Sequence, residues 1–311
     1  MYIPPFTISV NAINLIAEIS AQIERYAIRL EQSDGLKLRK ANRIKTIHSS
    51  LAIEGNTLSE DEVKEIIEGK TIVAPLRQIQ EVKNAIRTYE LYPSLHPFEV
   101  KDLLRAHETM MMALIDDAGK FRRGDVGVYS ERGLIHMAPP AERVPELIDS
   151  LFEWIKTAKD HLLIRSCVFH YEFEFIHPFS DGNGRTGRLW QSLILGQLHP
   201  LFEHLPVENM VYANQEAYYN AIQTSTKAAD SGPFIDFMLQ EILNTLKEHQ
   251  GKPIMNIETE SSSVRDKVRD KFGISSGQII DLIYQNPSIT LDEIAAHLSV
   301  TRRSIEKKIK E

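Results

Sequence analysis

Apolar residues recur at helical spacing along most of the chain. The stretches "INLIAEISAQIERYAIRL" (13–30) and "VPELIDSLFEWI" (144–155) carry them at positions i, i+3, i+4 and i+7, which predicts amphipathic helices. Ser59 and Glu62 have the spacing of a capping box and predict a helix that runs through Ile67. Further helices are expected over residues 36–53, 76–91, 97–113, 161–175, 185–198, 214–226 and 233–248. The pattern therefore indicates a mainly α protein.

One segment instead has the character of paired strands. The stretch "GVYSERGLIHMAPP" (127–140) predicts a short β-hairpin, and Pro139 and Pro140 end its second arm. The sequence shows no internal repeat.

The composition changes near the C-terminal end. Residues 249–263, "HQGKPIMNIETESSS", have the composition of a linker. The following segment, 264–311, predicts a helix-turn-helix that resembles a winged-helix domain: Thr290 with Glu293 forms a capping box, and Thr301 can cap a last helix. That last helix would carry Arg302, Arg303, Lys307 and Lys308. We expect four regions, with bounds at 1–95, 96–248, 249–263 and 264–311.

Composition and charge favour an ordinary globular protein and argue against several other classes. The 311 residues are 42% hydrophobic and 25% charged, which is typical of globular domains. A net charge of −7 gives no global basic field and argues against bulk nucleic-acid binding. Cys167 is the only cysteine, so a disulfide within the chain is excluded and a cysteine zinc site is disfavoured. With neither a signal-peptide pattern nor a membrane-length apolar run, a cytoplasmic protein that does not contact a membrane is expected.

The stretch "HPFSDGNGRTGRLW" (177–190) departs from the helical pattern and is rich in reactive and flexible residues. Its glycines permit a backbone nest of N–H groups at a helix N-terminus, where anions bind. Arg185 and Arg188 share one helix face and can clamp phosphate oxygens, whereas Asp181 offers a hard oxygen ligand for Mg²⁺. His177 is suited to accept a proton near neutral pH. Together they predict a nucleotide-phosphate site with its own base, which lacks the P-loop pattern.

The same residues carry a family resemblance. "HPFSDGNGRTGR" resembles the HPFx[DE]GNGRxxR motif of the Fic (Fic/DOC) family. The resemblance implies a Fic-type helical bundle with a β-hairpin flap, and transfer of AMP from ATP to a Ser, Thr or Tyr hydroxyl of a target protein or of the chain itself. It implies that His177 is the general base, that Asp181 holds Mg²⁺ against the α- and β-phosphates, and that Phe179 anchors the loop.

The resemblance also assigns the nucleotide contacts. Asn183 and the loop N–H groups would stabilise the α-phosphate, and Arg185 and Arg188 would bind the outer phosphates. The nucleotide-binding set in the loop is Gly182, Asn183, Gly184, Arg185, Thr186, Gly187 and Arg188.

Further segments extend the resemblance to about residues 3–245. Near the N-terminus, "PPFTISVNAINLIAEI" and "NRIKTIHSSLAIEGNTLSEDEV" are similar to the helical extension of many Fic proteins. "GKFRRGDVGV" and "GLIHMAPPAERVPELIDSLFEWI" are similar to the segment before and through the flap. There Leu134, Ile135, His136 and Met137 would align the target chain beside the nucleotide. In "NQEAYYNAI" (214–222), Tyr218 would contact the adenine, whereas for Tyr219 a role in packing between helices is at least as well favoured.

A candidate inhibitory motif lies far upstream of the loop. "SSLAIEGN" contains Ser50-x-x-x-Glu54-Gly55, which resembles the family's inhibitory [ST]xxxE[GN] pattern. A glutamate at a helix C-terminus is disfavoured by the helix dipole, so it gains from a cationic partner. If Glu54 pairs with Arg188, that arginine is unavailable to the γ-phosphate. The alternative is a solvated surface glutamate.

Several alternatives stay open at this stage. The chain could be a nucleotide-sensing, DNA-binding regulator, or a Fic enzyme that removes AMP or transfers another nucleotide. Residues 264–311 are a candidate contact for DNA or protein, and a homo-oligomer is compatible with the sequence. His48, His107 and His170 lack metal-binding spacing, so structural roles are expected for them.

Overall fold

The computed structural model describes residues 2–30, 35–130, 133–203, 205, 207–249, 290–298 and 300–301. Residue 249, expected to begin a linker, is the last residue of a helix, whereas residues 250–263 of the expected linker and most of the expected helix-turn-helix lie outside these residues. The chain divides into two compact units, Met1–Gln250 and Gly251–Glu311, which are described separately.

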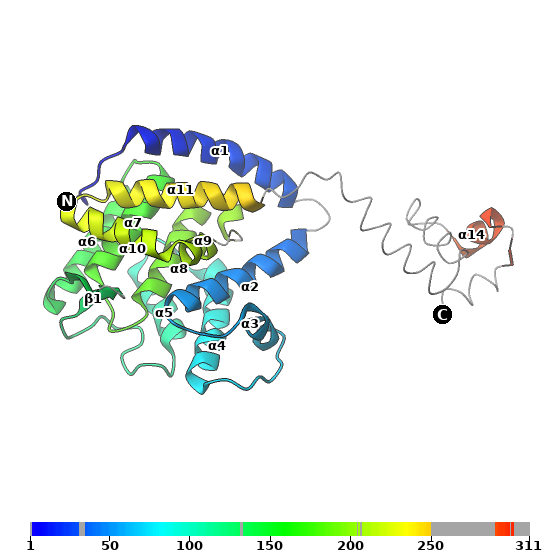
Figure 1. Ribbon diagram of the computed structural model, residues 1–311, viewed down its shortest axis with the longest axis horizontal. Helices are drawn as coiled ribbons and strands as arrows, with labels where there is room; N and C mark the ends of the chain where they lie inside the picture. Colours follow the sequence, from blue (N-terminus) through cyan, green and yellow to red (C-terminus); the bar gives the residue numbers. More distant parts are fainter. Residues whose placement is uncertain are drawn as a thin grey trace. The chain divides into compact units, whose positions relative to one another are not determined.

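Helices form most of the described part of the first unit (Figure 1). Their bounds are α1 Val10–Leu30, α2 Gly35–Ile53, α3 Glu60–Ile67, α4 Leu76–Leu91, α5 Val100–Met111, α6 Val144–Thr157, α7 Leu162–Ile176, α8 Asn183–Gly196, α9 Val207–Ala213, α10 Gln215–Ala228 and α11 Gly232–His249. Short 3₁₀ turns lie at Tyr92–Ser94, Ala141–Arg143 and Pro200–Glu203. The predicted mainly α fold is confirmed, and the expected helices agree with the observed ones to within about one turn. The sequence pattern did not reveal α9.

Capping chemistry sets the start of α3 as predicted. The Ser59 hydroxyl accepts a hydrogen bond from the Glu62 backbone N–H at 3.3 Å, and the Glu62 carboxylate accepts one from the Ser59 backbone N–H at 2.8 Å. Both halves of the capping box are therefore present, and they satisfy two N–H groups that the first helical turn leaves without a partner.

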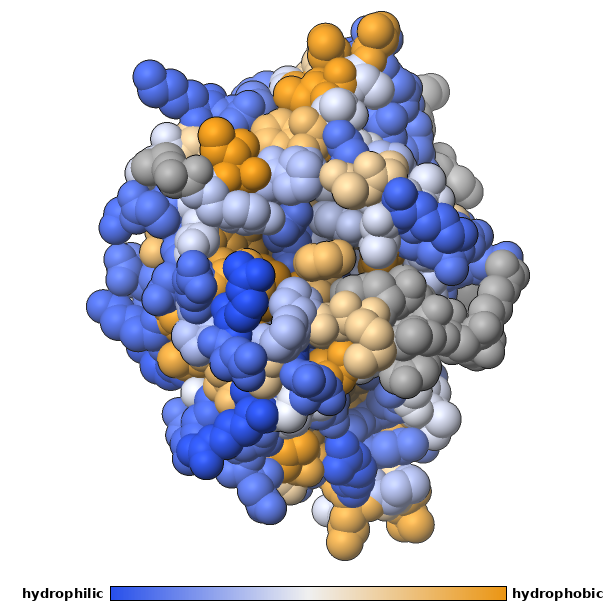
Figure 2. Space-filling view, turned by 90° about the vertical axis from the view of Figure 1, so that its left-hand side faces the viewer, coloured by the Kyte–Doolittle hydropathy of each residue, from blue (hydrophilic) through white to orange (hydrophobic). Residues whose placement is uncertain are grey.

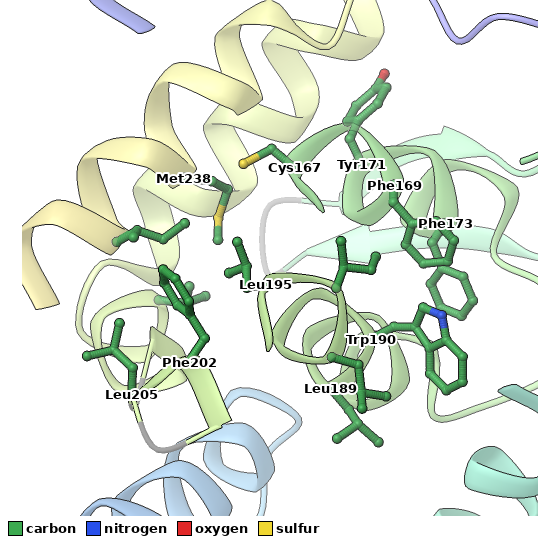
Figure 3. Packing of buried hydrophobic residues seen from close by; sticks show 14 of the residues in the cluster. Cys167, Phe169, Tyr171, Phe173, Leu189, Trp190, Leu195, Phe202, Leu205 and Met238 are labelled. Atoms are coloured by element: carbon green, nitrogen blue, oxygen red, sulfur yellow. The ribbon is translucent and has the colours of Figure 1, made fainter. Parts of the chain in front are cut away.

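The core of the first unit surrounds α7 and α8. Helix α7 packs against α6, α8 and α11, which explains why its sequence is apolar on every side. Figure 3 shows Phe169 and Phe173 of α7 gathered near Trp190 of α8, whereas Cys167 lies toward Met238 of α11. The loop between α7 and α8 is thus held at both ends by buried helices.

The predicted hairpin segment forms two strands, β1 (Gly127–Ser130) and β2 (Gly133–Met137). They pair antiparallel with Gly127 opposite Met137, and the register shifts between Val128 and Tyr129. The side chains of residues 128–136 lie outside the described part of the chain, so the roles expected for Leu134, Ile135 and His136 stay predictions. Met137 is exposed.

In the second unit the structure describes α14, Leu291–His297. Its start has the predicted capping box, because the Thr290 hydroxyl accepts from the Glu293 N–H and the Glu293 carboxylate accepts from the Thr290 N–H. Ile294 and Ala295 form a small apolar cluster with their neighbours. The expected last helix, with Arg302, Arg303, Lys307 and Lys308, lies outside the described residues.

One face of the molecule is mostly polar. Figure 2 shows a face on which hydrophilic side chains prevail and hydrophobic ones occur in scattered patches. Among the described helices, none combines the length and apolar character needed to cross a bilayer.

Candidate active site

His177 ends α7 in a left-handed conformation, with a φ of 50°. A non-glycine residue keeps this strained conformation where neighbouring contacts stabilise it, and here Arg122 provides such contacts. The buried Arg122 guanidinium donates to the carbonyl oxygens of His177 at 2.8 Å and Ile176 at 3.3 Å. It also donates to the carbonyls of Gly124 and Pro139, on the two sides of the hairpin. Arg122 therefore ties the hairpin to the backbone of the candidate base.

Phe179 fixes the middle of the loop. Its fully buried ring stacks on His107, with ring centroids 3.6 Å apart and planes 6° from parallel. The Asn183 side chain accepts from the Phe179 N–H and donates to the Phe179 carbonyl, both at 2.9 Å. Asn183 thus braces the loop, in addition to the phosphate contact predicted for it.

His107 supports the loop from α5. Burial lowers the pKa of His107 to about 4, so the ring is neutral near neutral pH. Its Nδ1 accepts from the Gly119 N–H at 2.9 Å, which leaves Nε2 to donate to the Asp181 carbonyl at 2.9 Å. This histidine has the structural role that the sequence predicted, and it is buried beside the site.

The N-terminus of α8 faces the same region as Asp181. Helix α8 begins at Asn183, directly after Gly182, whose φ is 82°. By helix geometry, the first N–H groups of α8 have no partner within the helix, which creates an anion-binding end. Asp181 Oδ1 accepts from the Gly182 N–H at 2.6 Å and from Arg185 Nη2 at 2.9 Å. Thr186 is buried and donates its hydroxyl to the Gly182 carbonyl.

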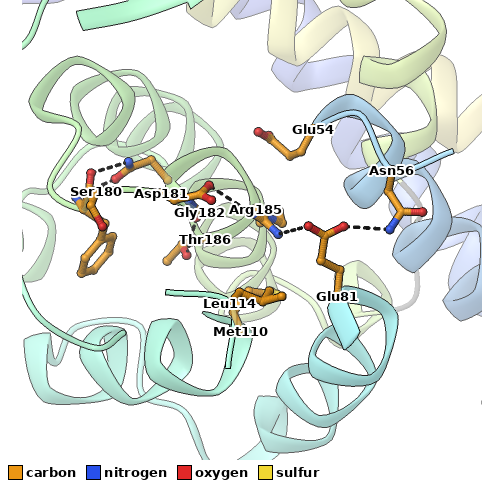
Figure 4. A network of polar contacts seen from close by, with 12 residues as sticks. Glu54, Asn56, Glu81, Met110, Leu114, Ser180, Asp181, Gly182, Arg185 and Thr186 are labelled. Atoms are coloured by element: carbon orange, nitrogen blue, oxygen red, sulfur yellow. Dashed lines mark hydrogen bonds and ion pairs between the residues drawn. The ribbon is translucent and has the colours of Figure 1, made fainter. Parts of the chain in front are cut away.

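A network of charged groups surrounds Arg185 (Figure 4). Glu81 of α4 lies 3.9 Å from Arg185 Nη1 and accepts a hydrogen bond from the Asn56 side chain at 2.8 Å. Arg77 of α4 lies 3.3 Å from Asp181 Oδ2 and 3.4 Å from Glu81. Sequence reasoning missed Arg77, Glu81 and Asn56. Their only local signal was the i, i+4 spacing of Arg77 and Glu81 and the place of Asn56 directly after Gly55.

The end of α2 brings Glu54 to the other arginine. Glu54 Oε1 lies 2.8 Å from Arg188 Nη2, and the same nitrogen donates to the Ser50 carbonyl at 2.8 Å. Arg188 Nε also donates to the Ser50 hydroxyl at 3.3 Å. The Arg188 side chain is 3% exposed and that of Glu54 is 31% exposed. The solvated alternative for Glu54 is thus not what the structure shows.

Gly55 determines where α2 ends. It has a φ of 88°, and its N–H donates to the Ala52 carbonyl at 3.0 Å. The Asn56 N–H donates to the Leu51 carbonyl at 3.1 Å. These two bonds form a Schellman turn, which requires a left-handed residue at its centre and therefore favours glycine. The turn places Glu54 as the last side chain of the helix, facing α8.

Electrostatics favour the Glu54–Arg188 pair. Burial alone would lower the pKa of Arg188, but the nearby Glu54 carboxylate outweighs it and the pKa is raised. A Cβ atom built at Gly184 would overlap Glu54 Oε1. The Glu54 carboxylate therefore lies directly over the first turn of α8, where an anionic ligand would bind.

Gly187 and Tyr218 pack behind this surface. A Cβ atom at Gly187 would lie 2.8 Å from Glu174 Oε1, so glycine permits the close approach of α7 and α8. Tyr218 is 2% exposed, and its hydroxyl lies 3.1 Å from His170 Nε2. The structure thus places Tyr218 among buried side chains of the helices, and its contact with adenine stays a prediction.

Comparison with solved structures identifies the family. The chain is similar to the crystal structure of a Fic family protein from Desulfovibrio desulfuricans G20, with 39% identity and a TM-score of 0.79. The alignment covers 98% of this chain and 89% of that one. The chain belongs to the Fic/DOC family. The Fic/DOC family pattern itself matches residues 97–195, from the start of α5 to the end of α8.

More distant relatives of this Fic chain carry names that state an activity. The chain is 28% identical over 246 residues to protein adenylyltransferase fic-1 of Caenorhabditis briggsae, covering 72% of this chain and 46% of the relative. It is 28% identical over 188 residues to a probable protein adenylyltransferase of Aquifex aeolicus, covering 58% and 54%. The chain thus spans about half the length of these relatives. Fic-1 of Caenorhabditis elegans shares the fold, with a TM-score of 0.62 at 21% identity.

Proposed function

We propose that this chain is a protein adenylyltransferase, which transfers AMP from ATP to a hydroxyl side chain of a target protein or of itself. The observation that carries the proposal is the convergence of His177, Asp181, Arg185 and Arg188 around the N-terminus of α8. The names of the more distant Fic relatives support the same activity.

The chemistry follows from positioning and charge. The target hydroxyl oxygen forms a bond to the α-phosphorus of ATP, and the bond from that phosphorus to the oxygen bridging to the β-phosphate breaks. Diphosphate leaves, and the hydroxyl proton passes to His177. The N–H groups at the start of α8, with Arg185 and Arg188, stabilise the negative charge that develops on the phosphates.

Asp181 fits the predicted role of magnesium ligand. Its carboxylate is 39% exposed and already lies against Arg77 and Arg185. A single carboxylate suits Mg²⁺, which is commonly held by one or two carboxylates together with substrate phosphates and water. When bound, the ion would neutralise phosphate charge, and Asp181 would hold it.

Glu54 would act as an internal brake in this enzyme. Arg188 cannot bind the γ-phosphate while it is paired with Glu54 and Ser50, and the Glu54 carboxylate repels an anion from the first turn of α8. ATP would then bind without its productive contacts.

Mass spectrometry after incubation with Mg-ATP tests the proposal. Glu54→Gly should gain the mass of one or more AMP groups, and the wild type should gain less. Glu54→Gly combined with His177→Ala should gain none, because the base is absent. Failure of Glu54→Gly to label either itself or any protein in a lysate would contradict the proposed activity. Equal labelling of wild type and Glu54→Gly would contradict the brake alone.

A further inference from the structure

Glu174 is a buried carboxyl group that the proposed chemistry does not use. It is 6% exposed, and its Oε1 atom has no hydrogen-bond partner in the described part of the chain. Burial of an unpartnered carboxyl group is costly, so its position requires an explanation. The charged or titratable groups around it come from α7, α8, α10 and the end of α2: His170, His177, Arg188, Tyr218 and Glu54.

Two oxygen atoms of Glu174 lie on the same side of the candidate base. The backbone carbonyl of Glu174 lies 3.3 Å from His177 Nδ1, and its Oε2 lies 3.8 Å from the same nitrogen. A carbonyl oxygen only accepts hydrogen bonds, so it favours the form of the ring that carries its proton on Nδ1. Nε2 is then the nitrogen that can take a proton from a target hydroxyl.

His170 does not satisfy the Glu174 carboxyl group. His170 Nδ1 lies 2.6 Å from the Gln191 side-chain oxygen, which can only accept, so Nδ1 carries the proton. Nε2 of His170 then accepts from the Tyr218 hydroxyl at 3.1 Å. Since that pair is complete in itself, His177 is the group on α7 toward which the carboxyl group can act.

We propose that Glu174 is a positioning residue for His177: it holds the Nδ1 proton through its backbone and stabilises the protonated ring through its carboxylate. The inference rests on the proposed function for its catalytic meaning. A carboxylate 3.8 Å from the ring favours the imidazolium that forms when His177 accepts the hydroxyl proton.

Glu174 also connects the base to the proposed brake. Burial raises the pKa of Glu174 to about 8, the Arg188 guanidinium opposes that rise, and the Glu54 carboxylate adds to it. Displacement of Glu54 from Arg188 therefore favours ionised Glu174. The brake would then act on two groups, by occupying Arg188 and by weakening the support of His177.

A histidine NMR titration of the full chain tests the role of Glu174 without any need for transfer activity. The His177 signals are assigned by their loss in His177→Ala. In the Glu54→Gly background, where ionised Glu174 is favoured, Glu174→Gln should lower the titration midpoint of His177 by about one pH unit, because the carboxylate charge is lost. Glu174→Asp keeps the charge and should retain part of the effect. Glu172→Gln is the matched control, since Glu172 lies on the same helix, is also buried, and accepts from Tyr2.

In the same Glu54→Gly background, adding Glu172→Gln should leave the midpoint of His177 unchanged. An unchanged midpoint in Glu174→Gln, or an equal shift in both glutamine variants, would overturn the proposal. In the Glu54→Gly background, Glu174→Gln should lower kcat at least tenfold with little change in the KM for ATP. If Glu54→Gly transfers no AMP, the proposed function fails, and the NMR titration still decides the role of Glu174.

Discussion

The strength of the Glu54–Arg188 pair can be predicted from its geometry. The 2.8 Å contact is a charge-assisted hydrogen bond, and such bonds contribute about 1.5–3 kcal/mol. Glu54 is 31% exposed, so solvent screening places the pair at the lower end, about 1.5–2 kcal/mol. Because 1.4 kcal/mol corresponds to a tenfold change, the productive state would be reduced about 10- to 30-fold. Glu54→Gln removes the charge and keeps the shape of the side chain.

Calorimetric titration with Mg²⁺ and a non-hydrolysable ATP analogue measures this effect. Glu54→Gln should bind the analogue about 10- to 30-fold more tightly than wild type. Glu60→Gln, which alters an exposed glutamate in the first turn of α3, should bind like wild type. A change below about threefold in Glu54→Gln would refute competition for Arg188 as the source of the brake.

Three other predictions concern stability. Phe179→Ala should lower the free energy of unfolding by about 3–5 kcal/mol in urea titrations, and a loss below about 1 kcal/mol would show that the loop is anchored elsewhere. Gly55→Ala should lower the free energy of unfolding by about 1–2 kcal/mol through backbone strain alone, because no atom lies close to the added methyl group. Gly124→Ala, at a glycine without a positive φ, should change it little, and equal losses in the two variants would contradict the role of strain. Burial raises the pKa of Glu208 from 4.5 to about 7, so its stabilising contribution is present below 4.5 and lost as the pH rises through about 7. The free energy of unfolding of wild type should therefore fall relative to that of Glu208→Gln between about pH 4.5 and 8. A difference between the two proteins that does not change with pH would contradict this prediction.

The sequence predicts a chemistry for the loop because the residue types that suggest it lie within one short segment. The identities of His177, Asp181 and Arg188 carry the chemistry, and the glycines indicate the backbone that presents it. The approach of Glu54 to Arg188 was expected only from the family resemblance, since 134 positions separate the two residues. The structure shows the physical reason for the motif: Gly55 ends α2 in a turn that leaves Glu54 facing α8.

Other parts of the site depend on contacts that have no local signal. Arg122 binds carbonyl groups of the loop and of the hairpin flanks, and nothing in its neighbouring residues indicates these acceptors. In the sequence, Glu174 is one of several polar residues in a largely apolar helix. Its role depends on α8 and His177, which lie beside it only in the folded chain. Helix α9 was missed because it is short and its sequence, "VENMVYA", has too few residues to establish a helical period.

The contacts of Arg188 with Ser50 and Glu54 depend on the spacing of these two residues along α2. Ser50 and Glu54 are separated by four residues, about one helical turn, and both accept hydrogen bonds from the same guanidinium. An insertion or deletion of one residue between them would rotate one acceptor by about 100° around the helix axis. The paired contacts with Arg188 thus depend on the length of this turn more directly than on the side chains between Ser50 and Glu54. If the proposed brake is correct, substitutions at the intervening positions would leave the pairing with Arg188 in place, whereas a single-residue change in length would remove it in one step.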